Sequence, residues 1–124
     1  MISYAQNFED LYLHRAFKDH SSGFYIDVGA WDPVRDSVTK HFYDAGWHGI
    51  NIEPEPRAFG LFPILRPRDI NLNVALGNAV GRAKFYRVAD TGLSTIRPDL
   101  AEEHRRSGRA VEEIEVPMTT LSEV

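Results

Sequence analysis

The stretch that decides the fold is Phe24-Tyr25-Ile26-Asp27-Val28-Gly29-Ala30, an apolar run that ends in an acidic residue and a glycine. Apolar side chains without alternation are typical of a strand buried on both faces, as in a parallel sheet. We therefore predict a strand over residues 24–28, followed by a turn at Gly29. Because ligands of open α/β sheets bind outside the carboxyl ends of the strands, Asp27 and Gly29 are candidates for a binding site.

Strands and helices alternate on both sides of this run. Apolar runs predict further strands at residues 49–53 and 70–76. Apolar positions at helical spacing predict helices at residues 6–20, 32–45 and 56–65. This alternation is typical of right-handed βαβ crossovers. The predicted fold class is therefore α/β, a partial Rossmann-like sheet of three parallel strands with helices.

Local signals indicate where the predicted helices begin and end. Asp32 can cap the second helix, Pro33 fits its first turn, and Gly46 is a natural stop. Pro63 lies inside the third helix and should kink or shorten it.

The remainder of the chain follows another pattern. Residues 82–88 and 111–118 alternate like strands, and we predict that they pair as an antiparallel β extension beside the parallel core. Between them, residues 91–95 are typical of a loop. Residues 98–106 are typical of a short polar helix that Gly108 ends.

The composition excludes several classes of protein. A formal net charge of -4 disfavours non-specific binding to nucleic acid, which needs surplus Lys and Arg. The sequence has no cysteine, which excludes a disulfide framework, a thiolate zinc site and a cysteine nucleophile. We find neither a signal peptide nor an apolar run long enough to span a membrane. We therefore expect a soluble, cytoplasmic protein that binds no membrane and no nucleic acid.

Two carboxylates follow the predicted parallel strands. Asp27 would repel a pyrophosphate but attract an amine or hydroxyl groups. Gly29 lets a ligand approach the backbone, yet the Gly-x-Gly-x-x-Gly pattern of dinucleotide sites is missing. Glu53 can accept hydrogen bonds from both ribose hydroxyls, although alone it would fit a solvated strand end better. Together the two carboxylates favour S-adenosylmethionine (SAM), which carries an ammonium group and a ribose.

Other polar residues leave alternatives open. Asn73 has donors and acceptors for an adenine edge, but it equally suits a turn. The acidic residues near Asp32 are too sparse for a calcium loop, so we expect no metal site, and a divalent-metal hydrolase stays an alternative. None of the five histidines has the spacing of a helical metal site, and we keep only His41 as a candidate base.

Several stretches, taken in their order along the chain, resemble the FkbM-type methyltransferases. The resemblance covers nearly the whole sequence, and the ordered combination is specific. The stretches are Tyr4-Ala5-Gln6-Asn7-Phe8-Glu9-Asp10, Phe24-Tyr25-Ile26-Asp27-Val28-Gly29-Ala30, Ile50-Asn51-Ile52-Glu53-Pro54, Asn73-Val74-Ala75-Leu76-Gly77 and Gly92-Leu93-Ser94-Thr95.

The resemblance implies a class I, Rossmann-like methyltransferase that uses SAM to methylate hydroxyl oxygens of sugars or natural products. Asp27 and Gly29 would then line the methionine end of SAM, and Glu53 would hold the ribose. The implied cofactor-binding residues are Asp27, Gly29, Ala30, Ser37, Glu53, Pro54, Asn73 and Ala75. The resemblance also implies a small-molecule or glycan acceptor, whereas the catalytic residue stays unknown.

The chain departs from the family pattern in two ways. Trp31 and Pro33 stand where many relatives have Asn and Gly. The family also continues into a fourth core strand, so we expect residues 1–124 to form a single domain that is truncated before that strand. The alternatives to an enzyme are an inactive remnant and a non-enzymatic module that binds SAM or a partner. The unpaired edge of the first strand further suggests a homodimer formed through that edge.

Overall fold

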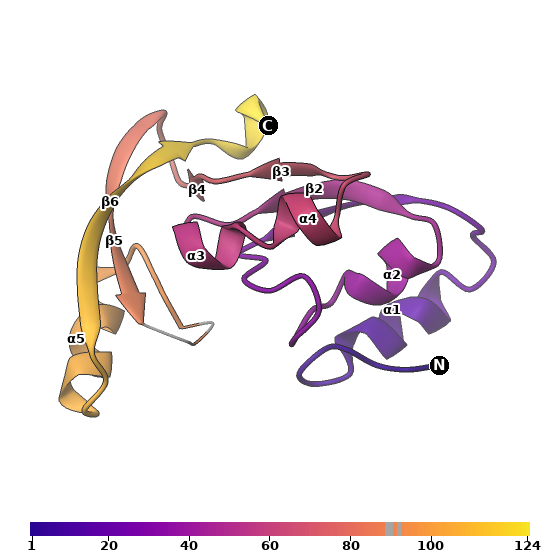
Figure 1. Cartoon of the computed structure of the whole chain (residues 1–124), viewed down its shortest axis with the longest axis horizontal. Helices are drawn as coiled ribbons and strands as arrows, with labels where there is room; N and C mark the ends of the chain where they lie inside the picture. Colours follow the sequence, from indigo (N-terminus) through magenta and orange to yellow (C-terminus); the bar gives the residue numbers. More distant parts are fainter. Residues whose placement is uncertain (89–90, 92) are drawn as a thin grey trace. The chain divides into compact units, whose positions relative to one another are not determined.

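The computed structural model describes residues 1–88, 91 and 93–124, which form two compact units, Met1–Leu72 and Asn73–Val124 (Figure 1). The first unit contains α1 (Glu9–Ala16), β1 (Phe24–Val28), α2 (Lys40–Asp44), β2 (His48–Ile52), α3 (Pro56–Phe59), α4 (Phe62–Leu65) and β3 (Ile70–Leu72). The second unit contains β4 (Ala75–Leu76), β5 (Gly81–Val88), α5 (Pro98–Arg106), β6 (Val111–Thr119) and a 3-10 turn, η1 (Leu121–Glu123).

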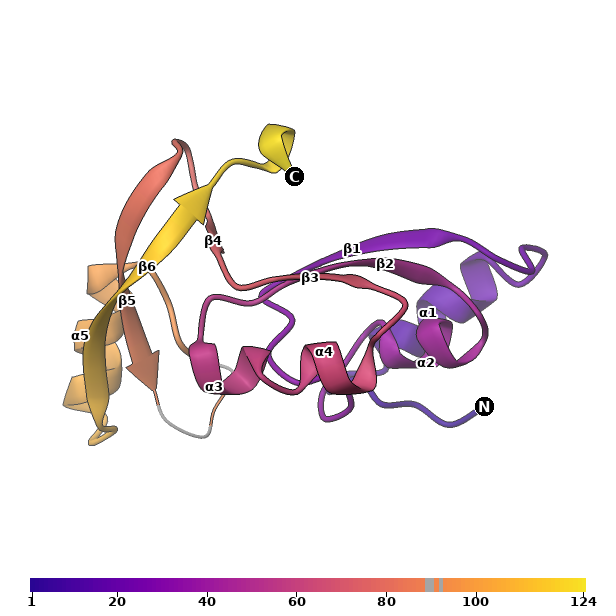
Figure 2. The same ribbon diagram turned by 45° about the horizontal axis from the view of Figure 1, so that its top comes forward.

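The sheet of the first unit is parallel, with its strands in the order β1-β2-β3. Its register aligns Asp27 with Asn51 and Asn51 with Asn71, so these three side chains share one face. Figure 2 shows α2, α3 and α4 against one side of this sheet. The predicted alternation of strands and helices is therefore confirmed, and β1 lies at the edge of the sheet.

The prediction that β1 is buried on both faces is wrong. Phe24, Ile26 and Val28 are 53%, 46% and 56% exposed, and Ile70, which shares their face by register, is 58% exposed. Within the first unit, the described helices leave this face uncovered (Figure 2). The apolar run therefore forms an edge strand with one apolar outer face.

Local signals predict some helix ends and miss others: α1 covers Glu9–Ala16, which is shorter at both ends than the predicted helix over residues 6–20. Asp32 Oδ1 accepts hydrogen bonds from the backbone N–H groups of Val34 and Arg35, but these bonds form a turn and not the start of a helix. Asp36 has a φ of 54°, which a right-handed helix cannot contain, so α2 begins only at Lys40 and the predicted start at Asp32 is wrong. Gly46, with a φ of 99°, ends α2 as predicted. Pro63 divides the third predicted helix into α3 and α4.

The predicted strand over residues 70–76 is divided between the two units. β3 pairs with β2 and ends where Leu72 aligns with Ile52, the last residue of β2. β4 instead pairs with β6 in the second sheet. Residues 70–76 therefore contribute a strand to each of two sheets, because β2, the partner of β3, ends at Ile52.

The second unit is built around a mixed sheet in the order β4-β6-β5. β5 and β6 pair antiparallel as predicted, and Ala75, Phe85 and Val116 form a buried apolar cluster between strands. α5 covers the predicted residues 98–106, and Gly108, which follows it, has a left-handed φ of 87°. Gly92 of the predicted loop lies outside the described residues. Along the described chain, we find no helix long and apolar enough to cross a membrane.

Candidate functional site

The loop after β1 folds back onto the end of β2. Gly29 takes a left-handed φ of 67°, which favours glycine. The N–H groups of Gly29 and Ala30 both donate to the carbonyl oxygen of Ile52, at 2.8 and 3.1 Å. This fold-back brings Asp27, Gly29 and Ala30 to the edge of the sheet where Glu53 and Pro54 follow β2.

Glu53 ties this loop to the segment after β2. One carboxylate oxygen accepts the N–H of Trp31 at 2.7 Å, and the other accepts the N–H of Glu55 at 2.8 Å. Glu53 is only 4% exposed. Burial raises the pKa of Glu53, while the hydrogen bonds from Glu55 and Trp31 oppose that shift. Glu53 is therefore a buried acceptor at the predicted place.

Asp27 lies on the helix-covered face of the sheet. Its Oδ2 accepts a hydrogen bond of 2.7 Å from the hydroxyl of Thr39, directly before α2. Burial raises the pKa of Asp27, and this shift is opposed by the Thr39 hydrogen bond and by the positive charge of Arg66. Two carboxylates with raised pKa values thus follow or end adjacent strands, an arrangement that is common at binding sites.

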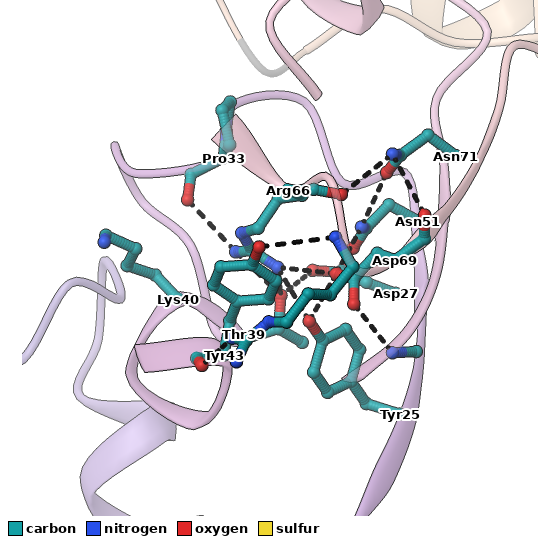
Figure 3. Close-up of polar contacts among 12 residues, drawn as sticks. Tyr25, Asp27, Pro33, Thr39, Lys40, Tyr43, Asn51, Arg66, Asp69 and Asn71 are labelled. Carbon is teal, nitrogen blue, oxygen red and sulfur yellow. Dashed lines mark hydrogen bonds and ion pairs between the residues drawn. The ribbon is translucent and has the colours of Figure 1, made fainter. Parts of the chain in front are cut away.

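A buried network around Arg66 supports Asp27 (Figure 3). The Arg66 guanidinium donates to the hydroxyl of Thr39 through both terminal nitrogens, at 3.2 Å each. It also donates to the carbonyl oxygen of Pro33 at 3.0 Å, the hydroxyl of Ser37 at 3.2 Å and the hydroxyl of Tyr25 at 3.0 Å. The guanidinium therefore joins β1, the loop before α2 and the segment after α4.

Asp69 provides the negative charge of this network. It lies 3.3 Å from Arg66 Nη1, and both side chains are almost fully buried. Asp69 also accepts hydrogen bonds from the hydroxyl of Tyr25, from the Gly49 N–H at 2.8 Å and from Asn51 Nδ2 at 2.8 Å. A buried ion pair is tolerated only with such additional hydrogen bonds, because both charges lose their hydration.

Sequence reasoning missed this network. Arg66 and Asp69 lie in a Pro-containing, charged connection that is typical of a solvated loop. Asn51 was the available signal, because a polar side chain inside a buried strand requires a buried partner. Nothing in the sequence, however, indicates which distant residue is that partner.

The remaining predicted site residues have different surroundings. Ser37 is buried, accepts from Arg66 and also accepts from the Lys40 N–H at 3.1 Å. Asn73 and Ala75 belong to the second unit, and Ala75 is part of its apolar cluster. The cofactor-binding role of these three residues stays a prediction, and the site described above is formed by the first unit.

His41, the candidate base, lies against α1. Its Nε2 is 3.0 Å from Nδ1 of His14. Burial and the neighbouring His14 lower the pKa of His41, so its ring is neutral near pH 7. Within the described ranges, no group of three or more His, Asp or Glu side chains is arranged to hold a metal ion.

Comparisons with known proteins assign the chain to a family. Searches of curated proteins and of solved structures gave no match. The model of the methyltransferase FkbM domain matches residues 27–124, a span that begins at the first carboxylate of the site and includes Glu53. Because this match covers most of the sequence, the chain belongs to the FkbM methyltransferase family.

Proposed function

We propose that this chain binds SAM at the carboxyl ends of β1 and β2, and that this site serves methyl transfer to a hydroxyl oxygen of a sugar or natural product on a Rossmann-like scaffold. Membership of the FkbM family supports methyltransferase activity. The observation that carries the proposal is the pair of carboxylates, Asp27 and Glu53, held on either side of the left-handed turn at Gly29.

Asp27 suits the ammonium group of SAM. Its Oδ2 is held by Thr39, and in the part of the chain that the structure describes its Oδ1 has no hydrogen-bond donor. An approaching cation favours the ionised carboxylate that burial disfavours, so the two charges stabilise each other in poorly solvated surroundings. Beside it, a Cβ added to Gly29 would meet nothing within 4 Å, so open space adjoins the turn.

Glu53 suits the ribose hydroxyls, with one condition. Each carboxylate oxygen accepts a backbone N–H, and a carboxylate oxygen can accept more than one donor, as a pair of ribose hydroxyls requires. Because the residue is only 4% exposed and the Trp31 N–H covers one oxygen, the ribose reaches it only when the Trp31 segment moves. We therefore expect this segment to shift when SAM binds.

The chain's own residues bind and orient the reactants. SAM, when bound, supplies the methyl group carried on its sulfonium sulfur. Asp27 and Glu53 would fix the two ends of the cofactor that flank this sulfur, and such positioning lowers the barrier to an in-line displacement.

Calorimetric titration with SAM and with S-adenosylhomocysteine tests the proposal. We expect Asp27→Asn and Glu53→Gln to weaken binding about 10- to 100-fold, the effect of losing a charge-assisted hydrogen bond. Asp44→Asn is the matched control, because Asp44 is a partly exposed carboxylate on α2 that pairs with Lys40. It should leave binding unchanged.

The pH dependence of binding gives a second readout. Burial raises the pKa of Asp27, so the carboxylate becomes protonated at a higher pH than an ordinary aspartate. SAM affinity should be constant while Asp27 is ionised and should fall as the pH drops through this raised pKa. A folded wild-type chain that binds neither compound would contradict the proposal and favour an inactive remnant or an interaction module.

The apolar face of β1 and β3 favours a second candidate, a non-enzymatic interaction module. Phe24, Ile26, Val28 and Ile70 are each about half exposed on that face. Contiguous exposed apolar side chains are typical of protein-interaction surfaces. A melting temperature that does not respond to SAM, in a well-folded chain, would support this candidate over the methyltransferase.

A homodimer through the edge of β1 is a separate part of the proposal. The pairing order β1-β2-β3 places β1 at an edge, where its backbone is available to another strand. Sedimentation should then show dimers at high concentration, and a monomer throughout would contradict this. A cytoplasmic location stays a prediction.

A further inference from the structure

We propose that Thr39 is a positioning residue for the cofactor site: Arg66 orients the Thr39 hydroxyl so that it donates to Asp27 and aims this carboxylate at the ammonium group of SAM. The inference rests on the proposed function for its ligand. The positioning role of Thr39 is inferred from its hydrogen bonds to Asp27 and Arg66 (Figure 3).

Thr39 is the N-cap residue of α2, but its side chain does not cap the helix. Threonine before a helix ordinarily accepts an N–H of the first turn, which stabilises the helix by about 1 kcal/mol. Thr39 precedes α2 and makes no such side-chain hydrogen bond. The Lys40 N–H instead donates to the hydroxyl of Ser37 at 3.1 Å. The Thr39 hydroxyl is therefore committed to the buried network.

The direction of the hydrogen bonds follows from the chemistry of the three groups. A guanidinium only donates and an ionised carboxylate only accepts, whereas a hydroxyl has one hydrogen and two lone pairs. Both terminal nitrogens of Arg66 lie 3.2 Å from Thr39 Oγ1, so they occupy its lone pairs. Its single hydrogen then points to Asp27 Oδ2, 2.7 Å away.

The position of Arg66 is itself fixed. The residue is 1% exposed and donates to Pro33, Ser37 and Tyr25 in addition to Thr39. Hydrogen-bond acceptors from several segments, including the Pro33 carbonyl oxygen, leave Arg66 little freedom to turn, so the Thr39 hydroxyl has one orientation. The Thr39 hydroxyl therefore holds Oδ2 of Asp27 in place. Because the two oxygens of a carboxylate are rigidly joined, the position of Oδ1 is restricted as well.

The same arrangement helps to keep Asp27 ionised. Burial raises its pKa, the Thr39 hydrogen bond and the Arg66 charge lower it, and the Asp69 charge raises it. Glu53 is the other carboxylate whose charge is coupled to Asp27. Removing the Thr39 hydroxyl should therefore raise the pKa of Asp27 further, and removing a more distant part of the network should raise it less.

Matched variants separate positioning from general stability. Thr39→Val removes the hydroxyl at nearly constant volume, Thr39→Ser restores it, and Tyr25→Phe removes a different hydroxyl bonded to Arg66. We expect Thr39→Val to weaken SAM binding about tenfold and to move the acid limb of binding to higher pH. Thr39→Ser should match the wild type in both respects. Tyr25→Phe, which keeps the Thr39–Asp27 hydrogen bond, should lower the melting temperature and move the acid limb less than Thr39→Val does.

Carbon-13 NMR of the Asp27 carboxyl, recorded without ligand, keeps this test independent of the proposed function. A wild type that binds no SAM would overturn the proposed function, and the Asp27 titration in Thr39→Val would still decide the role of Thr39. An unchanged Asp27 titration in a folded Thr39→Val variant would overturn the inference. If that variant does not fold, the wild-type Thr39 methyl signal should titrate with the Asp27 carboxyl, and a Thr39 signal that stays flat would overturn it.

Discussion

The two units of this chain differ in what they bury: the first unit buries charged side chains together with apolar ones such as Phe62 and Ile52, whereas the buried cluster of the second unit is apolar. Beneath the parallel sheet of the first unit, Arg66 and Asp69 are almost fully buried among polar partners. In the second unit the buried cluster is apolar, with Phe85 and Val116 at its centre. Charged side chains there, such as Arg82 and Glu115, are paired on the exposed face of β5 and β6.

The difference teaches what each interior can do. Apolar packing is non-directional, so an apolar cluster stabilises a unit without aiming any group. Hydrogen bonds in a buried polar network are directional, so the network fixes the orientation of the side chains that it contacts. We infer that the network of the first unit orients Asp27 at the site, whereas the cluster of the second unit serves to hold its sheet together.

The largest expected effect comes from breaking the buried ion pair. Arg66→Met leaves Asp69 charged and without its cation, which should lower the free energy of unfolding by about 3–5 kcal/mol. Urea unfolding measures the loss, and amide exchange should accelerate most in β1, β2 and β3. Arg68→Met is the control, because Arg68 is exposed although it lies only two positions from Arg66. Its Cζ atom lies 4.0 Å from the centroid of the Tyr43 ring.

A paired replacement sharpens this prediction. Arg66→Met combined with Asp69→Leu removes both charges, so it should recover much of the stability that the single change loses. The Asp27 pKa should nevertheless be higher than in the wild type, because the lost Arg66 charge lowers it more than the lost Asp69 charge raises it. If Arg66→Met were as stable as Arg68→Met, the claim that this network holds the first unit together would be wrong.

The next effect belongs to the second unit. Phe85→Ala leaves a cavity in the cluster with Ala75 and Val116 and should lower the free energy of unfolding by about 3 kcal/mol. Amide exchange should accelerate in β5 and β6. Lys84→Ala, a change at an exposed neighbour in the same strand, is the matched control. Equal acceleration in β1 and β2 would contradict the view that the two interiors act separately.

Patterns of short range predicted much of this fold. The runs at residues 24–28 and 49–53 formed adjacent parallel strands, and Gly46 and Gly108 ended helices, because backbone conformation at a glycine is a local property. The helix start at Asp32 failed for a similar local reason, since Asp36 turns into the left-handed region. Strand edges and exposed faces depend on which other segments pair or pack, and no local pattern contains that information.

The candidate site was predictable only in its outer residues. Asp27, Gly29 and Glu53 follow or end apolar strands, and their place at one edge follows from parallel pairing alone. The residues that hold them do not share any local pattern. Arg66 is 27 positions from Thr39 along the chain, and their contact depends on where α4 packs beneath the sheet.

The smallest expected effect concerns the exposed ion pairs of the second unit. Arg82 and Glu115 pair across β5 and β6, but their side chains are 58% and 62% exposed. Water competes for both groups, so a double-mutant cycle with Arg82→Gln and Glu115→Gln should give a coupling energy of about 0.5 kcal/mol. The coupling should shrink in 1 M salt, where exposed charges are screened within about 3 Å. The corresponding cycle for Arg66 and Asp69 should be larger and nearly independent of salt, because water and ions do not reach a pair that is almost fully buried. Equal coupling energies for the two pairs would remove the distinction drawn between the units, since both would then use charge in the same way.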